Sequence, residues 1–290
     1  MNIKQYEAFV KTAQLGSLTK AAEALDTTQS RISHVLSAME EEYGFCLMRR
    51  SRSGASLTDA GAMLLPKMEA VLRQNRELET LIADIRNADA GTVRLGAFTS
   101  VAVHWLPGMI QQFQGAHPQV ELKMFNGDYY DVEQWLRDGT VDLAFVTLPE
   151  PEGTRAIPLA EDALMAILPK GHPLAAQSRV DPARLGREPF ISLPQSSDHD
   201  IHRALDRAGI TPSVRYTTKD DYAVIAMVER GLGVSIVPEL LVRGRAQNVE
   251  LRPLEPGATR TIALAIPQGA VSPAVEAFAQ CAVEWLKENG

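Results

Sequence analysis

The stretch SLTKAAEALDTTQSRISHVLSAMEEEYGFCLMRRSRSGASLTDAG, residues 17–61, decides how the chain folds at its start. Ser17 follows a glycine and precedes a run of strong helix formers, so its hydroxyl can accept a hydrogen bond from an amide at a helix start. The short polar side chains of Asp26, Thr27 and Thr28 then interrupt that helix, because they compete for the backbone. A second helix is therefore predicted to begin near Thr28, which gives a helix-turn-helix.

The second helix of this pair has one apolar face and one polar face. Ile32, Val35, Leu36 and Met39 recur at helical spacing, which predicts that they are buried. The exposed first turns then carry donors and acceptors suited to base edges and phosphates in a major groove. An ordinary surface helix is the alternative, since the spacing alone is degenerate. The candidate DNA-binding residues of the two helices are Ser17, Thr28, Gln29, Ser30, Arg31, Ser33 and His34.

A compact basic turn follows the second helix. Arg49, Arg50 and Arg52 lie within four positions, among the small residues Ser51, Ser53 and Gly54. A solvated charged loop is one interpretation of such a run. Its position directly after a candidate reading helix favours the other, a wing whose arginines contact DNA phosphates.

These features resemble the N-terminal signature of LysR-type transcriptional regulators, most specifically over residues 1–61 and more loosely along the rest of the chain. The chain departs from the family pattern at Ser30 and Cys46, where proline is common, and at His34, where arginine is common, so the operator sequence of a relative does not transfer. The matching residues are Gly16-Ser17-Leu18-Thr19, Ala21-Ala22-Glu23, Leu25, Thr28-Gln29, Ser33, Met39-Glu40-Glu41, Gly44, Arg49, Leu57-Thr58 and Ala60-Gly61.

Composition is that of a globular protein with more than one domain. The chain has 290 residues, of which 45% are hydrophobic, and a formal net charge of -7. Residues 1–88 hold 11 Lys and Arg against 11 Asp and Glu, which leaves 18 against 25 for the remainder, so the whole negative balance falls after the head. A basic wing on a neutral head suffices for phosphate contact.

The sequence contains no uninterrupted apolar run of about 18 residues and no cationic leader, which predicts a cytoplasmic protein with no membrane contact. Cys46 and Cys281 lie far apart, a spacing that indicates neither a zinc motif nor a disulfide framework. We therefore expect no metal and no cofactor.

A long helix is predicted to follow the head, capped by Thr58 and running to about Ala88. A helix of some 30 residues is about 45 Å long and cannot bury its apolar stripe on a small head. It is expected to pair with the same helix of another subunit, although a solvated connector is the alternative. The resemblance implies the pairing too: a linker helix that dimerises and places two heads on successive half-sites of double-stranded DNA, in a homodimer or a homotetramer.

From residue 91 the pattern alternates between strands and helices, which predicts a doubly wound α/β architecture. The resemblance implies a two-lobed fold similar to periplasmic binding proteins, with a C-terminal helix that returns to the first lobe. The expected domains are 1–58, 59–90 and 91–290, with lobe one at 91–162 plus 268–290 and lobe two at 163–267. The expected strands are 93–98, 120–125, 141–147, 164–168, 190–192, 234–237 and 261–266, and the expected helices include 105–115, 132–138, 200–208 and 221–230.

Hydroxyl side chains follow several of these strands, where open α/β sheets bind ligands. Hydroxyls at two facing helix starts suit a carboxylate, which predicts a small organic acid as the effector. Asp128 and Asp131 would instead favour an amine or a zwitterion, and each hydroxyl alone could be only a helix cap. The candidate effector-binding residues are Thr99, Ser100, Thr147, Ser196 and Ser197.

Other classes of function fit the sequence less well. Asp198, His199, Asp200 and His202 could form a metal cluster, but no further ligand set accompanies them. No G-x-S-x-G elbow is present for hydrolysis. A solute-binding protein for transport would have no use for residues 1–88, and a metabolite sensor with vestigial DNA contact would not need the wing. The resemblance implies a regulator that is not an enzyme and that has RNA polymerase as a further partner.

Overall fold

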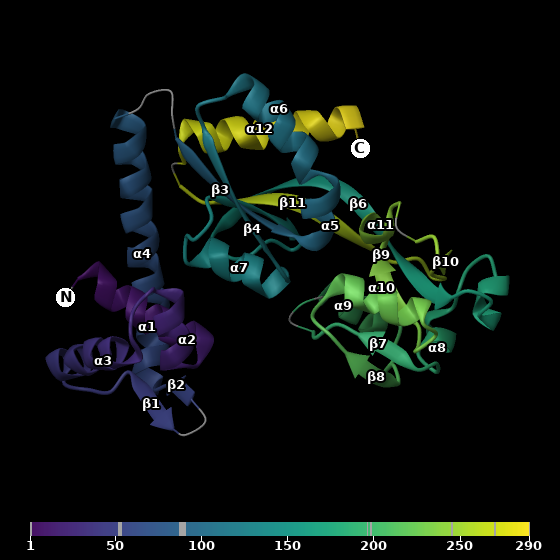
Figure 1. Cartoon of the computed structure of the whole chain (residues 1–290), viewed down its shortest axis with the longest axis horizontal. Helices are drawn as coiled ribbons and strands as arrows, with labels where there is room; N and C mark the ends of the chain where they lie inside the picture. The colour runs from purple at the N-terminus through teal and green to yellow at the C-terminus, as the bar shows by residue number, and fades with distance from the viewer. Residues whose placement is uncertain are drawn as a thin grey trace. The chain divides into compact units, whose positions relative to one another are not determined.

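A computed structural model describes residues 2–51, 54–86, 91–195, 197, 199–244, 246–269 and 271–289. The chain forms two compact units that divide after Arg86, and each is described by itself. The elements of the first unit are α1 (Ile3–Leu15), α2 (Leu18–Ala24), α3 (Gln29–Tyr43), β1 (Met48–Ser51), β2 (Gly54–Leu57) and α4 (Asp59–Arg86) (Figure 1).

Local signals fix the ends of the helices in this head. Asn2 forms a capping box with Gln5 at the start of α1, and Gly16 ends that helix in the left-handed conformation at a φ of 60°. Gly44 ends α3 in the same way, at a φ of 79°. The predicted helix-turn-helix is thus present as α2 and α3, with a hairpin of β1 and β2 after it.

The core of the head gathers apolar side chains from every helix. Phe9, Leu36, Met39 and Leu47 are fully buried in one cluster, together with the start of α4 through Met68. The predicted apolar face of α3 lies in this cluster, apart from a half-buried Val35. Burial of such side chains stabilises the head by roughly 1.5–3 kcal/mol for each, so the reading helix stands on a rigid support.

The long helix α4 leaves much of its apolar stripe uncovered by its own chain. It runs over Asp59–Arg86, as predicted apart from residues 87 and 88, which lie outside the described part. Met63, Val71, Leu78 and Ile82 are exposed along it. Their spacing of eight, seven and four residues places them within one side of the helix.

The second unit begins with a parallel sheet. Its elements are β3 (Thr92–Phe98), α5 (Thr99–His104), α6 (Leu106–Ala116), β4 (Glu121–Gly127), α7 (Tyr129–Arg137), β5 (Leu143–Thr147), β6 (Thr154–Pro169), η1 (Pro173–Ala176), α8 (Pro182–Leu185), β7 (Phe190–Ser192), α9 (His199–Arg207), β8 (Val214–Thr217), α10 (Asp221–Glu229), β9 (Ser235–Pro238), α11 (Glu239–Val242), β10 (Val249–Pro253), β11 (Thr259–Pro267) and α12 (Pro273–Asn289).

The long strand β6 joins two lobes. Its first half pairs with β11, and its second half pairs with β9 and β10. Lobe one therefore contains β3, β4, β5, β11 and the first half of β6, with α6 and α12 on one face of the sheet and α7 on the other (Figure 1). Lobe two contains β7 to β10 and the second half of β6, with α8, α9 and α10.

The boundary between the lobes differs from the predicted one. The expected lobe one resumes at residue 268, whereas β11, residues 259–267, already hydrogen-bonds to β5 of lobe one, and its Ile262, Leu264 and Ile266 lie in that core. The helix expected over 105–115 is present as α6, and a further helix, α5, precedes it. The sequence interpretation did not include the first half of β6, β8 or β10.

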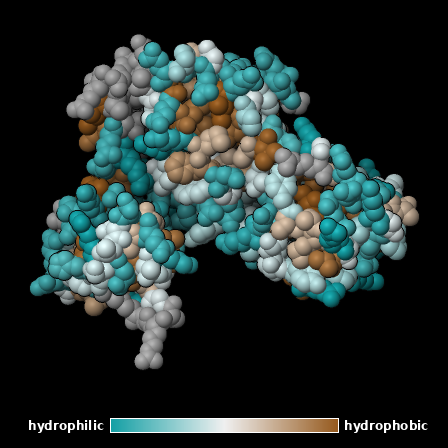
Figure 2. All heavy atoms as spheres, viewed as in Figure 1, coloured by the Kyte–Doolittle hydropathy of each residue, from teal (hydrophilic) through white to brown (hydrophobic). Residues whose placement is uncertain are grey.

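Among the described residues, no helix combines the length and the apolar character needed to cross a membrane. Figure 2 shows a mainly hydrophilic surface on the face it presents, with smaller hydrophobic patches between. A scatter of this kind is ordinary for a globular protein.

Candidate functional site

The reading helix α3 presents the predicted polar residues at its first turns. Gln29, Ser30, Arg31 and His34 are exposed, and Ser33 is half-buried. The two hydroxyls that precede the helices act as caps, as predicted for Ser17. Thr28 Oγ1 accepts from the Arg31 amide at 3.3 Å, and Ser17 Oγ accepts from the Lys20 amide at 3.4 Å.

The basic turn forms the antiparallel hairpin of β1 and β2. Arg49 lies opposite Ser56 and Arg50 lies opposite Ala55, and the Arg49 side chain is exposed. The side chain of Arg50 and the whole of Arg52 lie outside the described part. The hairpin therefore holds at least Arg49 on a short rigid strand, where it can meet a phosphate.

Glu40 fixes the hairpin to the reading helix, a role that the sequence interpretation missed. Its Oε1 accepts hydrogen bonds from the amides of Leu47 and Met48 at 2.7 and 3.0 Å. Thr58 holds the other end of the hairpin. Its hydroxyl donates to backbone oxygens of residues 46 and 47 and accepts from the Gly61 amide at 3.0 Å. The signature residues Glu40 and Thr58 thus position the hairpin.

A cleft of about 440 Å³ lies between the two lobes of the second unit. The end of β3 and the start of α7 line it from lobe one, and the start of α10 lines it from lobe two. Cavities of this size suit a small molecule. The polar and charged residues that line it are Thr99, Ser100, Asn126, Asp128, Tyr129, Asp131, Ser197, Lys219, Asp220, Asp221, Tyr222 and Arg260.

The structure brings three of the five predicted effector-binding residues to this cleft: Thr99, Ser100 and Ser197. Thr147 lies elsewhere: it is buried at the end of β5, and its hydroxyl is 3.1 Å from His199 Nε2, beside a cavity of about 10 Å³. Thr147 thus lies beside Tyr129 and His199 and does not line the cleft, and its assignment to the effector site stays a prediction. Ser196 lies outside the described part.

A buried ion pair that the sequence did not reveal lies at the floor of the cleft. Arg260 of β11 and Asp162 of β6 are directly opposite in the strand register, and their side chains are 2% and 7% exposed. Arg260 Nη2 lies 2.7 Å from Asp162 Oδ2 and also donates to Ser100 Oγ at 2.7 Å, while Nη1 donates to the Tyr129 hydroxyl. The guanidinium is thereby neutralised, and it orients the Ser100 hydroxyl from below.

Four aspartates line the same cleft: Asp128, Asp131, Asp220 and Asp221. Asp128 accepts from the Ser197 hydroxyl at 2.7 Å and lies 3.7 Å from Lys219 Nζ, so it links the two lobes. Burial raises the pKa of Asp221, against a hydrogen bond from Thr99 that lowers it, and burial likewise raises the pKa of Asp131. Because Asp162 already neutralises Arg260, Lys219 is the remaining cation of the lining, and the cleft is negative.

The raised pKa of Asp221 leads to a prediction about stability. Folded Asp221 binds a proton at pH values where an ordinary aspartate, of pKa 3.8, has lost it. The native state then holds more protons than the unfolded state, so this group's contribution to stability falls as pH rises from 3.8 through the raised folded pKa. Asp221→Asn cannot ionise, and we expect it to melt at a higher temperature than the wild type at pH 7.

The measurement is thermal unfolding of both proteins from pH 7 to pH 4, and the advantage of Asp221→Asn should shrink as pH falls. His199 acts in the opposite direction, since burial lowers its pKa and its protonation at acid pH destabilises the fold. It is common to both proteins and cancels in the difference. An advantage that is constant over the pH range would contradict the assignment to Asp221.

Among the described residues, no group of three or more His, Cys, Asp and Glu side chains is arranged to hold a metal ion. His202 Nε2 lies 3.1 Å from the Leu193 carbonyl oxygen, and His199 contacts Thr147. Asp198, the other member of the considered cluster, lies outside the described part.

Comparisons with known proteins agree with this geometry. Residues 3–62 match the bacterial regulatory helix-turn-helix protein family of lysR type, and residues 86–287 match the LysR substrate binding domain. The uncharacterised HTH-type transcriptional regulator YvbU of Bacillus subtilis is 32% identical over 92% of this chain and 92% of its own length.

Solved structures show the same fold. HinK, a LysR family transcriptional regulator from Pseudomonas aeruginosa, is 28% identical, with 98% of each chain covered and a TM-score of 0.60. The effector binding domain of QuiR in complex with shikimate is 25% identical, with 69% of this chain and 99% of that chain covered and a TM-score of 0.63. The chain belongs to the LysR family of transcriptional regulators, with a DNA-binding head and an effector-binding domain.

Proposed function

We propose that the head reads two operator half-sites as part of a homo-oligomer, with α3 contacting bases and the hairpin contacting phosphates. The observation that carries this proposal is the exposed polar start of α3, together with the exposed Arg49 on the hairpin that follows it. A helix-turn-helix inserts this end of its second helix into the major groove. We place this activity in the cytoplasm, where operator DNA and RNA polymerase are present.

Replacement of Arg49 and of Gln29 by alanine should have different effects on DNA binding. Arg49→Ala is expected to weaken binding to all sequences alike and to reduce the slope of log affinity against log salt by about one. Gln29→Ala should change which sequence is preferred, since its amide can pair with a base edge. Gel shifts over a salt series and a binding-site selection measure the two effects.

Each variant is the control for the other in this experiment. A loss confined to one operator in Arg49→Ala would count against phosphate contact by the hairpin. An unchanged preferred sequence in Gln29→Ala would remove Gln29 from the base-reading set.

The oligomer is proposed to form through α4. Exposed apolar side chains occupy one side of this helix at Met63, Val71, Leu78 and Ile82. Pairing two such stripes removes them from water and sets two heads at a fixed separation, as half-sites require. Homodimer and homotetramer both satisfy this argument, and sedimentation of the purified protein distinguishes them.

The effector is proposed to carry an ammonium group, as a zwitterion or an amine. Four aspartates surround the cleft, against Lys219 and an Arg260 that Asp162 neutralises. A purely anionic ligand would meet repulsion there, whereas an ammonium group gains charge-assisted hydrogen bonds. The Ser100 hydroxyl, which accepts from Arg260, can still donate to the carboxylate of a zwitterion. QuiR binds an organic acid, shikimate, and an organic acid is therefore the alternative to test.

Calorimetric titration with a panel of amino acids, amines and organic acids tests the effector class. We expect at least one ammonium-bearing compound to bind, and Asp221→Asn to weaken it roughly tenfold or more, because a charged hydrogen-bond partner is lost. Glu229→Gln, at the opposite end of α10, is a matched control and should leave the affinity unchanged. Binding by organic acids alone, unaffected by Asp221→Asn, would overturn the ammonium assignment.

A further inference from the structure

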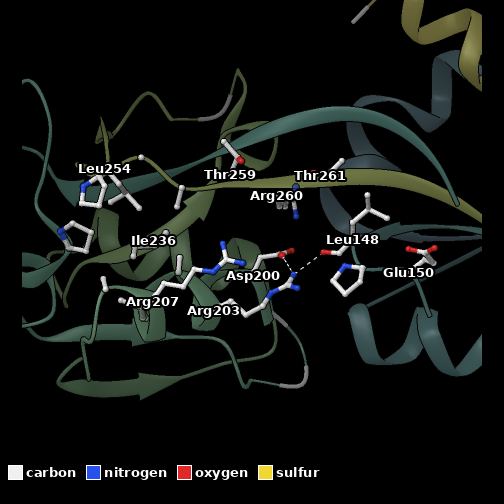
Figure 3. Close-up of a pocket in the computed structure, with 18 residues that line it drawn as sticks. Leu148, Glu150, Asp200, Arg203, Arg207, Ile236, Leu254, Thr259, Arg260 and Thr261 are labelled. Atoms are coloured by element: carbon white, nitrogen blue, oxygen red, sulfur yellow. Dashed lines mark hydrogen bonds and ion pairs between the residues drawn. The ribbon is translucent and has the colours of Figure 1, made fainter. Parts of the chain in front are cut away.

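A second and larger cavity, of about 740 Å³, lies in the effector domain outside the cleft already described. In Figure 3, Thr259, Arg260 and Thr261 of β11 lie above it, and Asp200, Arg203 and Arg207 of α9 lie below. Leu148, Ile236 and Leu254 add apolar walls. The cavity thus combines an apolar lining with a few polar groups that converge, as small-molecule sites do.

One face of α9 supplies two of the cations, and Glu150 and Arg260 also line the cavity. Arg203 and Arg207 are four residues apart, so their side chains are neighbours on the helix, and like charges at this spacing repel. Ala204 and Ala208 on the same face keep the space beside them open. Arg203 bonds to Asp200 and to the Leu148 carbonyl oxygen, whereas no ion pair or hydrogen bond of the Arg207 side chain is present within the described residues.

Asp200 supplies a second and independent indication of a ligand. The residue is 6% exposed and lines the cavity. Its Oδ1 accepts from Arg203, but Oδ2 has no hydrogen-bond partner in the part of the chain that the structure describes. A buried carboxylate oxygen without a donor is unfavourable and uncommon in folded proteins. A ligand that donates a hydrogen bond would satisfy it.

We propose that this cavity is a second ligand site, for a small carboxylic acid with an apolar tail and a hydroxyl group. The carboxylate pairs with Arg207 and relieves its repulsion with Arg203. The hydroxyl donates to Asp200 Oδ2, and the tail packs against the apolar walls. An acid is favoured in this cavity because its carboxylate can pair with Arg207, whereas the aspartates of the cleft would repel it.

The site is separate from the effector cleft but adjoins it through β11. Thr259, Arg260 and Thr261 of this strand all line the second cavity, and Arg260 also bonds to Ser100 and Tyr129 at the cleft. Arg260 borders both cavities. A ligand of the second cavity would therefore contact the strand that carries the floor of the first.

Calorimetry on the full-length protein with three matched probes tests the proposal: 2-hydroxyhexanoate, hexanoate and hexylamine. We expect the hydroxy acid to bind most tightly and hexanoate about tenfold more weakly, whereas any binding of hexylamine should depend on Asp221 in the cleft and not on Arg207. Arg207→Gln should weaken both acids roughly tenfold. Arg230→Gln, an exposed arginine at the end of α10 that lies outside the cavity, is the matched control and should bind as the wild type does.

Two further variants complete the test. One examines the hydrogen bond to Asp200, and the other distinguishes this cavity from the cleft. Asp200→Asn should reduce the preference for the hydroxy acid over hexanoate, and Asp221→Asn in the cleft should leave both affinities unchanged. Equal affinities in Arg207→Gln and Arg230→Gln would overturn the proposal. So would hexylamine binding that Arg207→Gln alters, or no saturable binding of either acid up to the order of 10 mM.

Discussion

Arg260→Met should lower the free energy of unfolding of the effector domain by about 3–5 kcal/mol, because it leaves the Asp162 carboxylate buried without its counter-ion. Asp162 would keep a hydrogen bond from the Leu240 amide, at 2.9 Å, but would lose both donors of the guanidinium. Ser100 and Tyr129 would each lose a donor as well. Urea unfolding followed by circular dichroism measures the change, with the midpoint and slope fitted separately.

Two comparisons show whether the uncompensated charge is the cause. The double variant Arg260→Met/Asp162→Leu removes both charges and should recover much of the loss, since apolar pairs of similar volume often replace buried ion pairs at little cost. Arg179→Met breaks an exposed pair with Glu255 and should change stability by less than about 1 kcal/mol. A double variant no more stable than Arg260→Met would indicate that lost packing, and not the buried charge, dominates.

Arg260→Met should also lower the affinity for the effector. Arg260 holds the Ser100 hydroxyl from below and lies 4.9 Å from the Phe98 ring centroid, so it fixes the floor of the cleft. Its removal in a variant that remains folded is expected to weaken the effector. This is a role in positioning, since the guanidinium has its own partners on every side.

The head could be predicted from sequence because its signals are local. Caps at Ser17 and Thr28, glycines that end helices and an apolar face at helical spacing each act within a few residues of the chain. The helix-turn-helix and α4 were expected on those grounds, the hairpin was expected from the basic turn at 49–54, and all three are present. The hydrogen bonds from the hairpin to Glu40 were not expected, because Glu40 and Leu47 are seven positions apart, across the end of α3 and the turn that follows it.

The cleft was harder to predict because its contacts join distant positions. Arg260 and Asp162 are 98 residues apart and meet only because β6 and β11 pair in one register. A shift of one residue would turn both side chains to the other face of the sheet. The predicted lobe boundary was wrong for the same reason, since strand pairing decides to which lobe β11 belongs. Thr147 ends its strand as expected, yet the depth at which Tyr129 and His199 cover it is set by tertiary packing.

Gly61→Ala should lower the free energy of unfolding of the head by about 3 kcal/mol, at the upper end of the usual cost of overpacking. An added Cβ would lie 2.2 Å from the Leu47 carbonyl oxygen and 3.1 Å from Leu57 Cδ2. That oxygen cannot easily retreat, because it accepts from the Thr58 amide at 3.0 Å and from the Thr58 hydroxyl at 3.1 Å. We therefore expect α4 and the hairpin to separate, and the DNA affinity to fall with the stability.

Gly115→Ala is the matched control, because the same methyl group at a helical glycine of α6 meets no atom within 4 Å. Alanine is the better helix former by roughly 1 kcal/mol, so this variant should be slightly more stable than the wild type and should bind DNA as well. Opposite signs for one chemical change would identify the close approach of α4 to the hairpin as the cause. If Gly61→Ala were also stabilising, the Leu47 carbonyl would be free to move. Thr58 and Gly61 would then not hold the hairpin against α4.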